Sequence, residues 1–329
     1  MTARALPLGL IQICLAGVLW GTGGLTLEVV RDHADLSFVA ISAWRMLVAA
    51  VVLLAAIAVL RRGRELVTLL RRSPGTACTV GLGTATYQAL YFGSVVEVGV
   101  TVATVVSLGL APVLLTAAEA LRHRRHPGVR RVVVILAALI GLVAVSGAAG
   151  AHETGPRPAL GVLLAIGSGA TYAATTALSR PVSQRFDPLP LTTVATTAGA
   201  IVLVPAALIA GGPLTTTDPV ALGSLVYLGV FTMALAYGLL YAGLRTTSST
   251  AAVVASLLEP VTAAVAAAVL LDERIGVLGV VGIVLILAAV AGAGRESAGE
   301  AVVPPDAGAK PASHPRGDRA PEPERATPG

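Results

Sequence analysis

The stretch Ser248–Leu271, SSTAAVVASLLEPVTAAVAAAVLL, decides how the rest of the chain is interpreted. A bilayer hydrocarbon core of about 30 Å needs roughly 20 apolar helical residues, so this stretch is long enough to cross it. Near its middle lie Glu259, which costs about 2.5–3.5 kcal/mol at that depth, and Pro260, which removes a helix hydrogen bond. We therefore expect both residues to face other helices rather than lipid.

The composition is that of a membrane protein. Of 329 residues, 55% are hydrophobic and only 12% charged, with a mean hydropathy of +0.82, which no soluble domain of this length has. The net charge is +5, but the arginines lie in loops between apolar spans, where they act as topology signals rather than a nucleic-acid surface. Cys14 and Cys78 each stand alone in an apolar span, so no disulfide framework or metal site is predicted.

Ten apolar segments with short connections predict an all-α integral membrane protein of ten transmembrane helices. The segments are approximately 6–30, 36–60, 76–96, 100–121, 129–149, 158–179, 190–210, 219–241, 248–271 and 275–294. The residues from 295 onward are rich in Pro, Gly, Ala and charge, and are predicted to form a disordered cytoplasmic tail.

The arginines sort strongly to one side of such a fold. If the amino terminus is cytoplasmic, the other side keeps only Arg31, Arg157 and Arg274. The cytoplasmic side then holds Arg4, Arg61, Arg62, Arg64, Arg71, Arg72, Arg122, Arg124, Arg125, Arg130, Arg131, Arg180, Arg185 and Arg245. This asymmetry predicts a multi-pass protein of the cytoplasmic (inner) membrane with both termini inside.

An internal repeat divides the chain into two halves. TVATVVSLGLAP (Thr101–Pro112) lies over STAAVVASLLEP (Ser249–Pro260) at an offset of 148 residues without a gap, and the same offset places Gly21 on Gly169 and Gly128 on Gly276. The offset equals five helices, an odd number, so the second copy is inverted relative to the first. Inverted repeats with interrupted helices are typical of secondary transporters.

Several short motifs in this order resemble the drug/metabolite transporter superfamily, and in particular its EamA-type branch. They are Trp20-Gly21-Thr22, Arg45-Met46, Pro112, Glu259-Pro260 and Asp272-Glu273-Arg274. The resemblance covers residues 1 to about 294 and divides the chain into repeats 1–149 and 150–294, followed by the tail 295–329. The acidic-Arg turn after the ninth segment has only a degenerate counterpart at Leu121–Arg125, so roles are not copied between the halves.

The resemblance implies a secondary active carrier, with efflux of a small metabolite as the more frequent direction among similar proteins. An amino acid, an amine, a purine and a drug-like molecule all remain open as substrates. The sequence holds no nucleotide-binding loop, so transport is expected to be driven by a gradient through alternating access, with no cofactor.

Glu259 is the leading candidate for the site, as a carboxylate that binds a cationic group or takes up a proton. Arg45 lies about nine residues into the second segment, too deep for easy contact with water. It either holds a substrate anion or neutralises Glu259 or Glu28. Both readings stay open at this point, as does a purely structural ion pair for Glu259.

The remaining candidates are polar or aromatic residues within the apolar segments. They are Trp20, Trp44, Tyr87, Gln88, Tyr91, Tyr237, Tyr241 and Glu119, with Pro112 and Pro260 as helix breaks. Each Tyr pair is spaced by four and shares a helix face; cavity lining competes with interfacial anchoring or core packing. Trp44 is expected to stack on Arg45 or on substrate, Trp20 to pack among glycines, and Glu119 to pair with Arg122.

Further expectations concern two glutamates on the non-cytoplasmic side and the fifth and tenth segments. Glu28 is expected to be interfacial and Glu97 to be solvated, while the resemblance implies that the fifth and tenth segments form scaffold rather than cavity wall. No HExxH, Walker or GxGxxG pattern and no catalytic constellation is present. An intramembrane lipid- or isoprenoid-modifying enzyme and a non-transporting assembly protein remain the alternatives, and the small-residue faces serve packing within one chain or in a homodimer.

Overall fold

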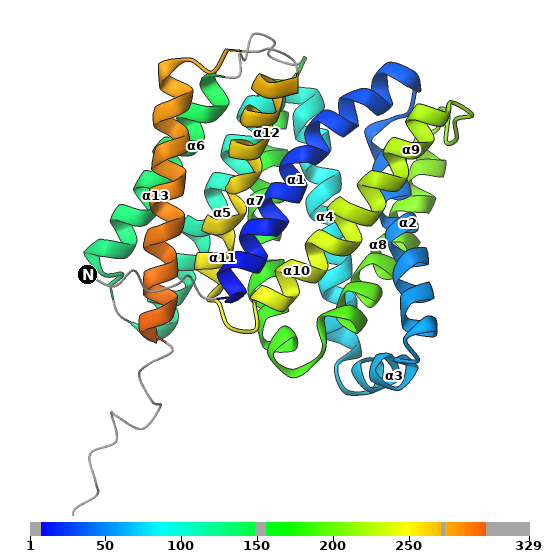
Figure 1. The fold of residues 1–329 in the computed structure, drawn as a ribbon, viewed down its shortest axis with the longest axis horizontal. Coiled ribbons are helices and arrows are strands. Elements are labelled where there is room, and N and C mark those ends of the chain that lie inside the picture. The colour runs from blue at the N-terminus through cyan, green and yellow to red at the C-terminus, as the bar shows by residue number, and fades with distance from the viewer. Residues whose placement is uncertain (1–7, 125, 149–155, 271–273, 301–329) are drawn as a thin grey trace, which may run out of the picture.

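The computed structural model describes residues 8–124, 126–148, 156–270 and 274–300, and every regular element in these ranges is helical (Figure 1). The first half comprises α1 (Leu8–His33), α2 (Phe38–Val59), α3 (Gly63–Arg72), α4 (Pro74–Val98), α5 (Val100–His123) and α6 (Val129–Ala148). The second comprises α7 (Pro158–Arg185), α8 (Pro188–Ala210), α9 (Pro219–Tyr227), η1 (Leu228–Leu235), α10 (Ala236–Gly243), α11 (Ser249–Ser256), α12 (Leu258–Leu270) and α13 (Val277–Glu300).

Within the described residues, each of the ten predicted segments is helical, which confirms the predicted fold class. Within the described ranges, nine spans are long and apolar enough to cross a membrane, counting α9 to α10 as one span and α11 to α12 as another. The tenth, α4, has 25 residues but is less apolar, because Thr84, Tyr87, Gln88, Tyr91 and Glu97 interrupt it. Of these residues, Tyr87, Gln88 and Tyr91 line the cavity described below.

Two helical features were absent from the sequence-based prediction. The amphipathic helix α3 occupies what was expected to be a loop, with Leu69 fully buried and its arginines exposed. In addition, α13 continues to Glu300, six residues beyond the predicted end of the tenth segment at residue 294. The residues of the tail beyond 300, and Asp272 and Glu273 of the predicted acidic-Arg turn, lie outside the described ranges.

The main contacts between the two halves are unchanged when each helix is exchanged for its equivalent in the other half. α6 packs against α13 and α2 against α8, and each of these pairs joins equivalent helices. α1 packs against α12 and α10 in the way that α7 packs against α5 and α4, and η1 packs on α2 as α4 packs on α8. Every one of these contacts has its counterpart, as expected for two repeats arranged about a pseudo-two-fold axis.

Glycines at equivalent positions allow the closest of these approaches. Gly81 in α4 and Gly229 in η1 are 148 residues apart. A Cβ added at Gly81 would lie 2.6 Å from the carbonyl oxygen of Ala195, and one at Gly229 would lie 2.5 Å from Cβ of Val48. The offset of 148 residues, which aligns three stretches of the sequence, therefore also relates the helix crossings at Gly81 and Gly229. The sequence alone did not identify these two crossings.

The two predicted helix breaks differ. The ninth segment is divided at Leu257, where α11 ends and α12 begins, three residues before Pro260, whose missing N–H leaves the carbonyl of Ser256 without its helical partner. In contrast, α5 runs from Val100 to His123 as a single helix through Pro112, so the break expected there is wrong. A membrane helix tolerates proline where neighbouring helices compensate for the lost bond, and Pro112 is buried among them.

Candidate functional site

A cavity of about 470 Å³ lies between the two halves. Its deep walls come from α1, α2, α4, α7, α10 and α12, and its mouth is formed by Glu28, Arg31, Phe38, Val100 and Arg274. These mouth residues lie near the ends of α1, α2, α5 and α13 that share the upper end of the bundle in Figure 1. The cavity thus opens at the end that holds few arginines, opposite to α3.

The opposite side of the cavity is closed by tightly packed side chains. Tyr241 is 1% exposed, and it lines a small void of about 10 Å³ together with Thr84, Ser179 and Tyr237. That void has about the volume of a single water molecule's probe sphere, so it offers no passage for a solute. The conformation is accordingly open at one end only.

Arg45 is held in place by the irregular segment η1. Its Nη2 donates a hydrogen bond to Oγ1 of Thr232 over 3.1 Å, and Thr232 Oγ1 itself donates to the Leu228 carbonyl over 2.6 Å. The carbonyl of Thr232 accepts a hydrogen bond from the indole nitrogen of Trp20 over 2.8 Å. In a π-helix the shifted bonding pattern changes which backbone groups are free, and such segments are frequent at functional sites. Thr232 thereby joins α1, α2 and η1.

Glu259 lies in the first turn of α12, directly after the interruption at Leu257. The amino-terminal end of a helix favours a negative charge, so the break stabilises a carboxylate at this depth. Glu259 and Arg45 attract each other across the cavity, but they form no ion pair with each other. Of the two readings left open for Arg45, a direct ion pair with Glu259 is therefore absent in this conformation.

Gln88 is an unusual buried amide. Its side chain is 3% exposed and lines the cavity, yet neither its Nε2 nor its Oε1 has a hydrogen-bond partner. The Nε of Arg45 is likewise buried without a partner. Leaving a buried polar group unsatisfied costs about 1–3 kcal/mol, so native structures seldom retain one without a reason. Gln88 and Arg45 are the two cavity-lining residues among those whose buried polar atoms have no partner in the described part of the chain.

Aromatic rings form most of the wall between the charges. Tyr87 contacts Tyr172 with 5.1 Å between ring centroids, and Trp20 meets Tyr237 edge-on at 5.2 Å. The hydroxyl of Tyr91 shares a hydrogen bond of 2.8 Å with Thr104. All of these rings line the cavity. They present an apolar surface bordered by hydroxyl groups, a lining suited to a small organic molecule with a polar end.

Four residues lie in places other than those expected. Trp44 points away from the cavity, packs in a small outer cluster and donates to the Leu214 carbonyl over 2.7 Å, because it is rotated from Arg45 by one residue of helix. Tyr241 lies beneath the main cavity. Glu119 pairs with Arg131 at 2.6 Å rather than with Arg122, since the start of α6 returns beside the end of α5, and it accepts a hydrogen bond from Thr250 over 3.3 Å.

The fourth correction concerns Glu97, which was expected to be solvated. It is 7% exposed and is bonded to Arg157 at the start of α7, with 2.9 Å between Nε of Arg157 and Oε2. The hydrogen bond to Glu97 raises the pKa of Arg157 above its ordinary value. In addition, Ser146 of α6 and Gly279 of α13 line the cavity, so the two presumed scaffold helices contribute to its outer wall.

Sequence reasoning also missed Thr232, Tyr172 and Ser256. Tyr172 lines the cavity and donates to Ser256 over 2.9 Å, three residues before Glu259 and across the interruption at Leu257. Tyr172 carried a usable signal, as an aromatic residue with a hydroxyl group within an apolar segment, like the tyrosines that were identified. The role of Thr232 depends on the π-helix, which no residue pattern announces. No group of three or more His, Cys, Asp or Glu side chains suited to a metal lies within the described part of the chain.

The fold is that of an all-helical membrane protein built from internal repeats, and the family comparison identifies it as a membrane transporter. The model of the EamA-like transporter family matches residues 7–147 and again 159–295, and the chain belongs to this family. It is 28% identical over 278 residues to "Uncharacterized transporter YwfM" of Bacillus subtilis (strain 168), covering 84% of this chain and 90% of that protein. A crystal structure of a protein of unstated function has a TM-score of 0.74 at 21% identity, covering 89% of this chain and 98% of the other.

Proposed function

We propose that the chain is a gradient-driven carrier that exports a small organic molecule bearing one cationic and one anionic group. Three features support it: family membership, a cavity open at one end only, and Arg45 and Glu259 facing that cavity without pairing. The last of these carries the choice of substrate class. An intramembrane Arg and Glu left apart are costly unless a ligand compensates both.

The anionic group of the substrate would lie at Arg45. The guanidinium already has its Nη2 bonded to Thr232, which orients it, while its Nε remains free. A carboxylate there would accept from Arg45 and from Nε2 of Gln88, giving charge-assisted hydrogen bonds to groups that have no other partner. The cationic group would lie at Glu259, from the other half of the protein.

The body of the substrate would lie among the rings of Trp20, Tyr87, Tyr91 and Tyr237. A cavity of about 470 Å³ falls within the usual range of about 300–1,000 Å³ for small-molecule sites. Rings next to the cation site also favour an ammonium group by cation–π attraction. An amino acid with an apolar or aromatic side chain combines these features, whereas a simple amine or a purine would leave Arg45 uncompensated.

Glu259 would also couple transport to a gradient. One carboxylate holds either a proton or the substrate ammonium group, so the two compete, and exchange of one for the other across the membrane links their movements. The two-fold arrangement of the helices supplies the frame for opening at alternate ends. The arginine-rich end carrying α3 would face the cytoplasm, with the cavity open to the outside in this conformation.

The test uses full-length protein in sealed liposomes and three matched probes: phenylalanine, phenethylamine and 3-phenylpropionate. We expect saturable counterflow of phenylalanine, efflux of preloaded phenylalanine that is faster with an inward proton gradient, and little movement of either singly charged probe. Equal movement of phenethylamine and phenylalanine would contradict the two-charge substrate. Absence of any counterflow across a wide metabolite panel, together with consumption of bilayer lipid, would instead favour the intramembrane enzyme.

A further inference from the structure

The amphipathic helix α3 is not used by the proposed transport mechanism. Its sequence GRELVTLLRR follows directly on Arg61 and Arg62, so five arginines fall within twelve residues. Seen from Figure 1, it lies at the lower end of the bundle, between α2 and α4. An amphipathic helix at the end of a membrane bundle packs one face against the protein and presents the other face to lipid or water.

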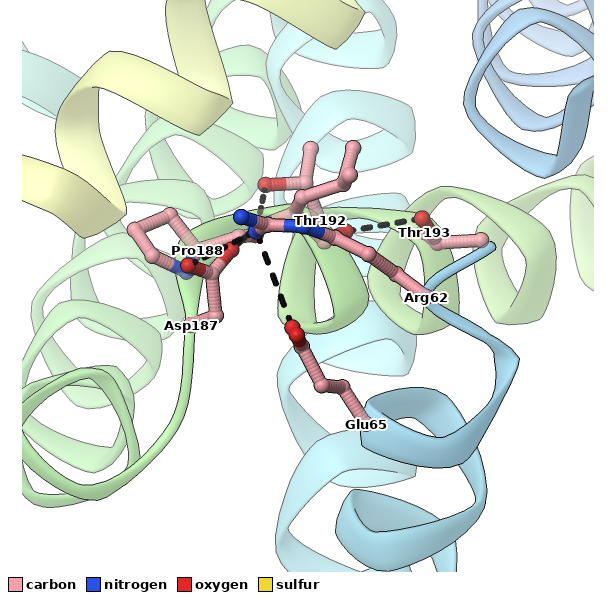
Figure 2. Close-up of polar contacts among 7 residues, drawn as sticks. Arg62, Glu65, Asp187, Pro188, Thr192 and Thr193 are labelled. Atoms are coloured by element: carbon pink, nitrogen blue, oxygen red, sulfur yellow. Dashed lines mark hydrogen bonds and ion pairs between the residues drawn. The ribbon is translucent and has the colours of Figure 1, made fainter. Parts of the chain in front are cut away.

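The protein-facing side of α3 is fixed firmly. Leu69 is fully buried, and α3 packs against α8 and α4. Arg62, at the amino-terminal cap, bonds to Asp187 at 3.0 Å and lies 3.6 Å from Glu65 (Figure 2). Asp187 in turn caps α8 by accepting from the N–H of Leu189 over 2.9 Å. Figure 2 shows Arg62 between the two acidic side chains, joining α3 to the loop that precedes α8.

The opposite side of α3 has no partner in the described residues of this chain. Val67 and Leu70 are 46% and 40% exposed, and Arg64 and Arg71 are exposed beside them. At 100° per residue these four side chains occupy adjacent positions on one face, with the apolar pair nearer to the bundle and the arginines farther round. An apolar strip bordered by arginines matches the boundary between acyl chains and headgroups, where long basic side chains extend toward phosphate.

We propose that this α3 face (Arg64, Val67, Leu70 and Arg71) is a binding site for the headgroup of an anionic phospholipid. The side chains of Val67 and Leu70 enter the upper acyl region, and Arg64 and Arg71 bind the phosphate and the net negative charge of the headgroup. A protein partner would need an acidic, apolar surface at headgroup depth, whereas the bilayer supplies the complementary charge and the apolar layer together. Because Arg62 is already engaged with Asp187, the lipid site does not need it.

The site predicts headgroup selectivity of a stated size. Each arginine near an anionic surface contributes about 1 kcal/mol, so the pair favours an anionic over a zwitterionic lipid on the order of thirty-fold. The preference falls as ionic strength rises, because exposed charges are screened.

The experiment titrates the full-length protein, in neutral detergent micelles, with phosphatidylglycerol or phosphatidylcholine of the same acyl chains and counts bound lipids by native mass spectrometry. We expect wild type to prefer phosphatidylglycerol and the Arg64→Gln/Arg71→Gln variant to bind both lipids equally. The Arg64→Lys/Arg71→Lys variant should retain most of the preference. The control Arg185→Gln/Arg245→Gln removes two exposed arginines from the same end without touching α3, and should keep it.

The outcomes separate the proposal from a general effect of charge. Selectivity that persists in Arg64→Gln/Arg71→Gln, or that falls equally in Arg185→Gln/Arg245→Gln, would overturn the α3 site. The Val67→Asn/Leu70→Asn variant should weaken binding of both lipids and leave their ratio unchanged. Unaltered binding by that variant would overturn the seating of α3 in the acyl layer. Thermal unfolding of each variant checks that these exposed substitutions leave the fold intact.

Discussion

The fourth segments of the two halves have related sequences but different structures. In the first half α5 is one continuous helix from Val100 to His123. In the second half the aligned residues form α11 and α12, divided at Leu257. At the repeat offset of 148, Glu259 lies over Ala111, a small buried residue. The carboxylate and the break that stabilises it thus occur together in one half only.

The third segments of the two halves also differ, and again the irregular helix lies in the second half. α4 is a regular helix of 25 residues, whereas its equivalent passes through α9, the π-helix η1 and α10. The π-helix presents Thr232 to Arg45 and Trp20, while α4 contributes Gln88 and its tyrosines directly as side chains. The repeat therefore provides a symmetric arrangement of helices. Several residues of the site come from features that differ between the halves, namely the polar side chains of α4 in the first half and the π-helix in the second.

The largest expected effect comes from removing the asymmetric charge. Glu259→Gln should lower pH-driven exchange in liposomes by about a hundredfold, because truncating one member of a buried charge system costs about 2–5 kcal/mol. Glu28→Gln, an exposed carboxylate at the mouth of the same cavity, is the matched control and should change exchange by less than about twofold. Equal losses in the two variants would indicate a general electrostatic effect on the cavity.

The symmetric frame can be tested at its equivalent glycines. Gly81→Ala and Gly229→Ala should each destabilise the protein by about 1–3 kcal/mol, since the added methyl group meets Ala195 O or Val48 Cβ at under 3 Å. Gly24→Ala, where nothing lies within 4 Å, should be neutral or stabilising. Thermal unfolding in detergent measures all three. A strong effect at only one of the two equivalent positions would break the comparison.

Thr232→Val tests the contribution of the π-helix. The substitution keeps the shape but removes the hydroxyl that accepts from Arg45, and a hydrogen bond to a charged group is worth about 1.5–3 kcal/mol. We expect substrate affinity to fall by about tenfold, and the free energy of unfolding to fall by about 1.5–3 kcal/mol, because the bond is already formed without substrate. Thr26→Val, which removes a hydroxyl bonded only to the Thr22 carbonyl, serves as the control. Unchanged affinity in Thr232→Val would mean that Arg45 is oriented without η1.

The smallest effect is expected where the halves meet outside the membrane. Arg62→Gln removes the ion pair with Asp187. Because the side chains of Arg62 and Asp187 are 39% and 35% exposed, the free energy of unfolding should change by less than about 1 kcal/mol. At the other end Glu97, which is buried, should be more sensitive: Glu97→Gln leaves Arg157 without its charged partner. Comparable unfolding temperatures for the two variants would contradict this ranking.

Much of the frame could be predicted from the sequence, because apolar length and arginine placement follow directly from the bilayer. The residue types along the chain predict the ten helical segments, the repeat offset and the interruption near Pro260. The boundary of α13 and the helix α3 were missed, since a short basic segment looks like a loop until Leu69 is seen buried. Pro112 misled for a physical reason, because one lost hydrogen bond does not divide a helix that its neighbours support.

The candidate site was predictable only residue by residue. Arg45, Gln88 and Glu259 were conspicuous as polar groups in apolar helices, and all three line the cavity. Their relation was not predictable, because it depends on rotation about each helix axis. One residue of rotation turns Trp44 away from the cavity although it is adjacent to Arg45. Hydrogen bonds such as Thr232 to Arg45 join residues 187 apart and leave no local pattern.

The central claim is that the two halves supply opposite charges for one bound molecule. Isothermal titration of purified wild type, Arg45→Gln and Glu259→Gln with phenylalanine, phenethylamine and 3-phenylpropionate tests it most directly. Wild type should bind phenylalanine at least about tenfold more tightly than either analogue, Arg45→Gln should lose discrimination against phenethylamine, and Glu259→Gln should lose discrimination against 3-phenylpropionate. Equal affinity of wild type for phenylalanine and phenethylamine, unaltered by Arg45→Gln, would contradict the account.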